Sequence, residues 1–128
     1  MDLKDLTPKS DKVEVHIVHP ATLEPLTNDD KSPMTITMYA PHSKEYKAAV
    51  HAQTNKRLKS KNLEVTAELL EETTLELLAT ATKEWNITFD GEQPKYTKAK
   101  AKSIYTEVFW LRDQIEGAIS NSLDFMKV

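Results

Sequence analysis

Four histidines are the side chains best suited to metal binding or to proton transfer. His16 and His19 are close in sequence, but the alternation around them predicts a strand. Residues three apart on a strand point to opposite faces, so these two imidazoles cannot share an ion without a bend. His42 falls in a predicted turn and His51 in a predicted helix, without the carboxylate spacing of a zinc motif or a catalytic triad. We therefore expect no metal site and no catalytic histidine.

Other catalytic and cofactor-binding signatures are missing as well. Phosphate-binding loops need glycines that let the backbone approach the phosphate, and the chain has only Gly91 and Gly117. The absence of cysteine excludes thiolate catalysis and disulfides. The adjacent carboxylates of Glu71 and Glu72 fall on a predicted amphipathic helix, where a solvated surface explains them. The sequence predicts a protein that is not an enzyme and holds no cofactor.

A basic stretch over residues 44–61 is the strongest indication of nucleic-acid binding. It holds six basic residues and one acidic residue, Glu45. Only one aromatic side chain, Tyr46, is available there to stack on a base, and the net charge of the whole chain is −3. A solvated helix face is the main interpretation, and a small nucleic-acid-binding regulator is the alternative.

The run Phe109-Trp110-Leu111 is the strongest indication of protein binding. Three successive large apolar side chains cannot all face the core from one helix, so at least one is expected at a helix junction or on the surface. A corner between two helices, packed under the sheet, is one interpretation. A partner-binding patch is the other, because Trp and Phe concentrate binding energy at interfaces. The candidate partner-binding residues are Tyr105, Phe109, Trp110, Leu111 and Ile115.

Two strands are expected near the N-terminus, because apolar and polar residues alternate over 13–18 and 34–39. They are predicted to pair antiparallel as a hairpin with a long loop. Residues 85–89 alternate again and lead into a turn at Asp90-Gly91, where glycine accepts a positive φ without steric cost.

Helical spacing of apolar residues predicts about four helices after the hairpin. The first is expected to begin at a Ser43 cap and to end near residue 58, and the second to run from an Asn62 cap to Trp85. The third follows residues 94–97, and the last begins near residue 110. The apolar side of the third is expected at Ala101, Ile104, Tyr105 and Val108, and that of the last at Leu111, Ile115, Ala118, Ile119, Ser122 and Leu123. Gly117 inside the last helix indicates a close approach by another helix, either within the fold or across an oligomer contact.

The predicted fold class is α+β, mainly α, with an N-terminal β-hairpin followed by about four helices. Residues 1–11 are polar and aperiodic and are expected to form a flexible N-terminal arm, and residues 12–128 a single domain. No stretch approaches the roughly 20 apolar residues that span a bilayer, and the N-terminus has no apolar signal segment. A cytoplasmic protein is expected.

The order of these features resembles the tail assembly chaperones of long, non-contractile-tailed phages (siphophages) and of prophages derived from them. The matching pieces are short and cover nearly the whole chain: residues 19–26, 43–46, Trp85 with 87–91, the helix 97–105, the run 109–111 and Phe125. The chain differs from the family at Leu23, where a glycine is usual in the turn, and over 39–41, which lacks a glycine.

The resemblance implies a protein that binds the tape-measure protein during tail morphogenesis, keeps that apolar helical chain soluble and helps recruit the major tail (tube) protein. It implies action in the host cytoplasm, absence from the mature virion and possible assembly into a homo-oligomer. Neither nucleic acid nor membrane is an expected partner. A connector or tail-completion protein that stays in the virion is a further alternative, beside the nucleic-acid-binding regulator.

Overall fold

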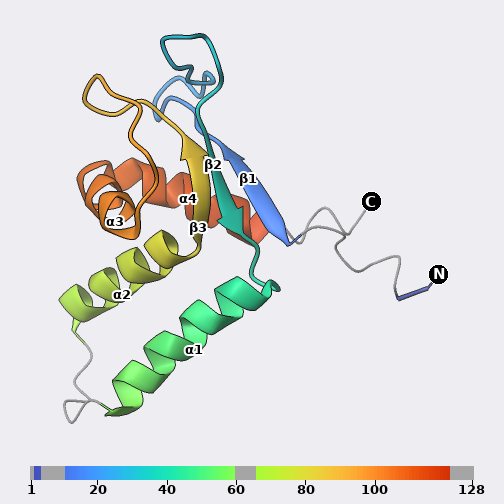
Figure 1. Cartoon of the computed structure of the whole chain (residues 1–128), viewed down its shortest axis with the longest axis vertical. Coiled ribbons are helices and arrows are strands. Elements are labelled where there is room, and N and C mark those ends of the chain that lie inside the picture. Colours follow the sequence, from blue (N-terminus) through green and yellow to red (C-terminus); the bar gives the residue numbers. More distant parts are fainter. Residues whose placement is uncertain (1, 4–10, 60–65, 122–128) are drawn as a thin grey trace.

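The computed structural model describes residues 2–3, 11–59 and 66–121. Three antiparallel strands, β1 (Lys12–His16), β2 (Thr35–Tyr39) and β3 (Thr82–Asn86), form one sheet in the order β1-β2-β3. Four helices accompany it: α1 (Lys44–Lys59), α2 (Ala67–Thr80), α3 (Lys98–Glu107) and α4 (Phe109–Asn121). In Figure 1, α3 lies beside the sheet, α4 runs behind its strands, and α1 and α2 extend from its lower end. The predicted α+β, mainly helical class, with an N-terminal hairpin and four helices, is confirmed.

The hairpin forms because alternate residues of its strands are apolar. In β1 the side chains of Val13 and Val15 are buried, whereas the residues between and beside them are exposed. Val15 pairs with Ile36 and Val13 with Met38, and both β2 side chains have no exposed surface. The antiparallel register therefore brings four apolar side chains to one face of the sheet.

The third strand and the length of the second helix correct the sequence prediction. We expected the helix to continue to Trp85, but it ends at Thr80, and β3 begins two residues later. Ile36 of β2 pairs with Trp85 of β3, which satisfies backbone groups that β2 would otherwise leave open on that side. The Thr82 hydroxyl donates to the Leu78 carbonyl oxygen at 2.7 Å, where the chain leaves the helix. Strand pairing thus overrides the helical periodicity.

Local capping chemistry sets where the described helices begin. The Ser43 hydroxyl accepts a hydrogen bond from the Tyr46 amide at 3.0 Å, as the sequence predicts. The Thr97 hydroxyl accepts from the Lys100 amide at 3.1 Å and caps α3. The second helix is capped by Thr66, and the predicted cap, Asn62, lies outside the described residues.

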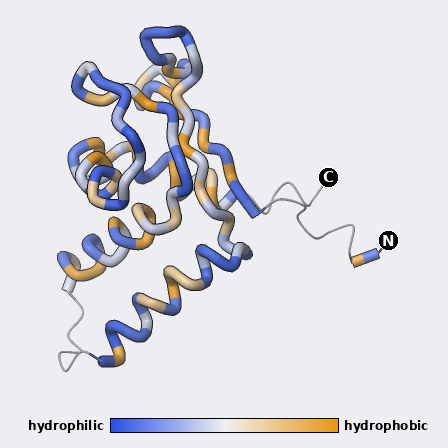
Figure 2. The backbone as a smooth tube through the Cα atoms, viewed as in Figure 1, coloured by the Kyte–Doolittle hydropathy of each residue, from blue (hydrophilic) through white to orange (hydrophobic). Residues whose placement is uncertain are grey.

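The core lies between one face of the sheet and the inner sides of α2, α3 and α4 (Figure 2). Most of the predicted inner residues of the last two helices are buried: Ala101, Ile104, Tyr105, Leu111, Ile115 and Ile119. Val108 and Ala118, also predicted, are half-buried and pack against this core. Ser122, Leu123 and Phe125 lie outside the described residues, as does most of the predicted N-terminal arm. None of the described helices is long and apolar enough to cross a membrane.

Backbone geometry at residue 23, at residues 90–91 and at residue 117 bears on features that the sequence singled out. Leu23 has a φ of 63°, in the left-handed region, and its amide donates to the His19 carbonyl oxygen at 2.9 Å. Asp90 and Gly91 both have positive φ, which confirms the predicted turn. A side-chain carbon built on Gly117 would meet nothing within 4 Å. A close approach of another helix at Gly117 within the fold is therefore wrong for the described residues, and an oligomer contact there stays a prediction.

Helices α1 and α2 are inserted between two neighbouring strands of the sheet. β2 leads into α1, and α2 leads directly into β3. At the base of this insertion, the Tyr39 amide donates to the Ala81 carbonyl oxygen at 2.8 Å. We call the pair α1 and α2 the helical arm.

Candidate functional site

The structure separates the five residues that the sequence put forward for partner binding. Tyr105, Leu111 and Ile115 are at most 4% exposed and belong to the core, so they are not available to a partner in this conformation. Phe109 is 65% exposed, and Trp110 is half-buried. Only these two aromatic side chains remain as candidate contacts from that set.

The predicted helix junction explains this separation. Val108 ends α3 with a φ of −98° and a ψ of 73°, outside the helical region, and α4 begins at the next residue. The chain therefore changes direction immediately before the aromatic run. Phe109 points away from the core, whereas Leu111, two residues later, is 4% exposed.

Tyr105 has a structural role instead. Its hydroxyl lies 2.8 Å from the Thr82 hydroxyl, and its ring meets the Trp85 ring edge-on at 6.4 Å. Burial raises the pKa of Tyr105 well above its usual range, and the hydrogen bond with Thr82 opposes this only in part. The phenol therefore stays protonated and joins α3 to β3.

Exposed apolar side chains collect on the helical arm. Seven large hydrophobic residues of the described chain are exposed, and four of them lie on the arm: Val50 (37%), Leu58 (74%), Leu69 (40%) and Leu70 (50%). The other three are scattered, at Leu3, Leu23 and Phe109. Single exposed hydrophobics are ordinary, but four on one helix pair mark a candidate contact surface.

The sequence held one signal of this surface, the adjacent pair Leu69 and Leu70 near the start of α2. Side chains of successive helix residues point about 100° apart, so both face the core only where a wide side of the helix is covered. In the structure neither does, because α2 enters the core only from Leu75 onward.

Helix α1 is held weakly to the rest of the molecule. Of its 16 residues only Ala49 is buried, and Tyr46 and Gln53 on the same side are half-buried. The Gln53 side-chain amide donates to the Thr73 carbonyl oxygen at 2.7 Å, the one side-chain hydrogen bond described between α1 and α2. Beyond it, residues 54–59 and 66–72 are all exposed. We call these two segments the tip of the arm.

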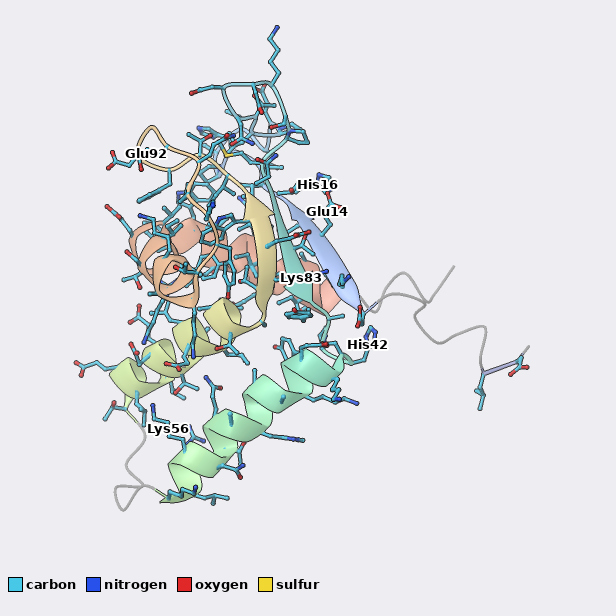
Figure 3. All side chains as sticks on the ribbon, in the orientation of Figure 1. Glu14, His16, His42, Lys56, Lys83 and Glu92 are labelled. Carbon is cyan, nitrogen blue, oxygen red and sulfur yellow. The ribbon has the colours of Figure 1, made fainter. Side chains whose placement is uncertain are left out.

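A groove of about 400 Å³ lies between the two helices of the arm. Val50, Leu69 and Leu77 contribute its apolar lining. Its charged residues differ in sign between the two sides, with Lys56 and Arg57 on α1 and Glu72 and Glu76 on α2. In Figure 3 Lys56 lies between the distal parts of the two helices. The shape and lining suit an apolar segment that carries charge along its margins.

The acidic side of the groove is neutralised within the molecule. Glu76 pairs with Lys98 at 3.0 Å and with Lys102 at 3.4 Å, and Glu72 also pairs with Lys102. The hydrogen bond from Lys98 is the main cause that lowers the pKa of Glu76, and the bond to Glu72 raises the pKa of Lys102. Glu71 pairs with Arg112 at 3.2 Å. These ion pairs join α2 to α3 and α4.

The basic side of the groove has no such compensation. Helix α1 carries five basic side chains against one acidic one. None of the carboxylates in the described ranges forms an ion pair with Lys56 or Arg57. We call these two residues the basic lip of the groove.

None of the histidines lines this groove, and His42 and His51 both line a second pocket at the start of α1. His16 is beside Glu14 at 3.5 Å on the exposed side of β1 (Figure 3). The Nδ1 atom of His19 accepts hydrogen bonds from the amides of Ala21 and Thr22, so this ring holds the following turn. Within the ranges that the structure describes, no three His, Asp or Glu side chains are grouped to hold a metal ion.

Comparisons of the chain with protein-family models, with curated proteins and with solved structures found no match in any of the three.

Proposed function

We propose that this chain is a phage tail assembly chaperone that holds an apolar helical segment of the tape-measure protein on its helical arm. In this proposal it keeps the client soluble in the host cytoplasm, helps recruit the major tail protein, and is absent from the mature virion. The observation that carries the proposal is the exposure of four large apolar side chains on the helical arm, Val50, Leu58, Leu69 and Leu70. Val50 and Leu69 also line its groove. The order of sequence features that resembles the chaperone family supports it.

The exposed area suits a binding protein that must later release its client. Together the four side chains expose the equivalent of about two whole residues. Burying that much apolar surface contributes roughly 3–6 kcal/mol. Association itself costs an estimated 4–15 kcal/mol, so contacts beyond these four side chains are needed for stable binding. Such a complex dissociates without any covalent step.

Suppression of client aggregation tests the proposal. A tape-measure segment is diluted from denaturant, and light scattering is followed with and without the protein. The double variant Leu58→Ser with Leu70→Ser should lose most of the protection, because it removes exposed apolar surface from the arm. Its control is Phe109→Ser, which removes one exposed apolar side chain outside the arm.

The outcomes separate the two candidate surfaces. Protection by the control but not by the arm variant supports the helical arm. Protection lost only in Phe109→Ser moves the client to the junction of α3 and α4, and unchanged scattering with the unmodified protein contradicts the chaperone function. Mass spectrometry of purified particles addresses the virion-resident alternative, because a chaperone should be missing from them.

The uncompensated charge of α1 favours a second candidate, a small nucleic-acid-binding regulator. Five basic side chains lie on this helix against one acidic residue. For such a regulator, the logarithm of the affinity for duplex DNA falls with the logarithm of salt concentration, by about 0.9 for each phosphate contacted. The affinity should be lost when Lys56, Arg57 and Lys59 are replaced together by glutamine. Salt-insensitive or absent binding contradicts this candidate.

A further inference from the structure

The two sides of the groove on the helical arm differ in how their charges are satisfied. Helix α2 has four glutamates and no basic residue, but Glu71, Glu72 and Glu76 are paired with cations of α3 and α4. The basic lip, Lys56 and Arg57, has no described carboxylate partner. The groove is therefore asymmetric, with one side already neutralised and one side open to an anionic group.

The geometry of the arm fits a helix as the occupant. Two helices that are separated along an apolar groove leave space for a third, whose side chains pack between theirs at interaxial distances of about 8–10 Å. Val50 and Arg57 bracket two turns of α1, which corresponds to about 11 Å. A partner helix would cover this length with apolar side chains at positions i, i+3, i+4 and i+7.

We infer that the groove takes an acidic amphipathic helix, whose apolar stripe lies on Val50, Leu69 and Leu77 and whose carboxylates face Lys56 and Arg57. This inference rests on the proposed function and names the kind of client segment that the arm selects. The apolar stripe supplies most of the contact area. The basic lip sets the orientation and the preference, because exposed charge pairs change specificity and association rate more than affinity.

The experiment uses two labelled synthetic helices with the same apolar stripe. One carries glutamate at the positions beside the stripe, and the other carries lysine. Fluorescence anisotropy measures the binding of each to the full chain at low and at high salt. The acidic helix should bind about tenfold more tightly at low salt, which corresponds to about 1.4 kcal/mol. The two affinities should converge at high salt, because exposed pairs are screened.

Two charge-matched variants of α1 locate the effect. Lys56→Glu with Arg57→Glu should remove or reverse the preference for the acidic helix. Lys44→Glu with Lys47→Glu makes the same change of net charge on the same helix, at positions that do not line the groove. This control should keep most of the preference, because only long-range attraction is altered.

Several results would overturn the inference. They are equal binding of the two helices, an equal loss in both variants, and tighter binding to duplex DNA than to the acidic helix. Binding of neither helix also overturns it. If the unmodified protein still suppresses client aggregation in any of these cases, the chaperone function stands and only the proposed occupant is wrong. If it does not, both fail.

Discussion

Replacing Gln53 by alanine should loosen α1 without unfolding the core. The Gln53 side chain donates to the Thr73 carbonyl oxygen at 2.7 Å, and Ala49 is the only buried residue of that helix. Loss of one such hydrogen bond costs about 1 kcal/mol. Because the missing bond lies between α1 and α2, the cost should appear as local opening of the arm rather than as a loss of global stability.

Native-state hydrogen exchange measures this opening residue by residue. A change of about 1 kcal/mol corresponds to roughly fivefold faster exchange of the α1 amides. Amides of α3 and α4, whose inner side chains Ile104, Tyr105 and Ile115 have almost no exposed surface, should keep their rates. Asn55→Ala is the control, because it brings alanine into the same helix at an exposed position that makes no described hydrogen bond to α2.

Two results of the exchange experiment would refute this prediction. Unchanged α1 exchange in Gln53→Ala would show that the hydrogen bond to Thr73 does not hold the arm. Faster exchange throughout the described core would show that the arm and the core open as one unit.

Three further predictions concern stability. Leu23→Gly should raise the free energy of unfolding, measured by urea titration, by about 0.5–1 kcal/mol. The φ of 63° is strained for leucine, and its side chain is 71% exposed, so little packing is lost. The control Leu23→Ala should show no such gain. Gly117→Ala should raise the thermal midpoint, with a gain of about 1 kcal/mol, because nothing lies within 4 Å of the added carbon; a lower midpoint would reveal an undescribed neighbour. The Lys98 pair lowers the pKa of Glu76, so its stabilisation is present above the usual glutamate pKa of about 4.3 and is lost as the pH falls through the folded value. Lys98→Gln should thus cost about 0.2–1 kcal/mol at pH 7 and almost nothing near pH 2, and an equal cost at both pH values would contradict the pairing.

The features that sequence predicted well are those set by neighbouring residues. Alternation at Val13, Val15, Ile36 and Met38 specifies which face of the hairpin is buried, because a one-residue slip would expose all four side chains. The predicted cap at Ser43 depends on a hydroxyl that accepts from the amide three residues later, which is also a local interaction.

The features that sequence missed depend on distant partners. Helical spacing continues past Thr80, and only the pairing of β3 with β2 ends the helix there. The predicted set of partner-binding residues was wrong in part for a similar reason. Tyr105 and Phe109 are four residues apart, but the break at Val108 sends one into the core and the other into solvent. The exposure of Leu58 follows from the distance between the tip of the arm and the core, which no local pattern encodes.

The backbone bond between Tyr39 and Ala81 closes the helical arm at its base, where two adjacent strands meet it. Substitutions at the tip therefore alter no buried side chain, whereas those near Leu75 and Leu78 reach the core. Such a division lets selection act on the two regions separately. Under the proposed function, lineages that share this scaffold would diverge fastest over residues 54–59 and 66–72, following the sequences of their client chains while the sheet stays unchanged.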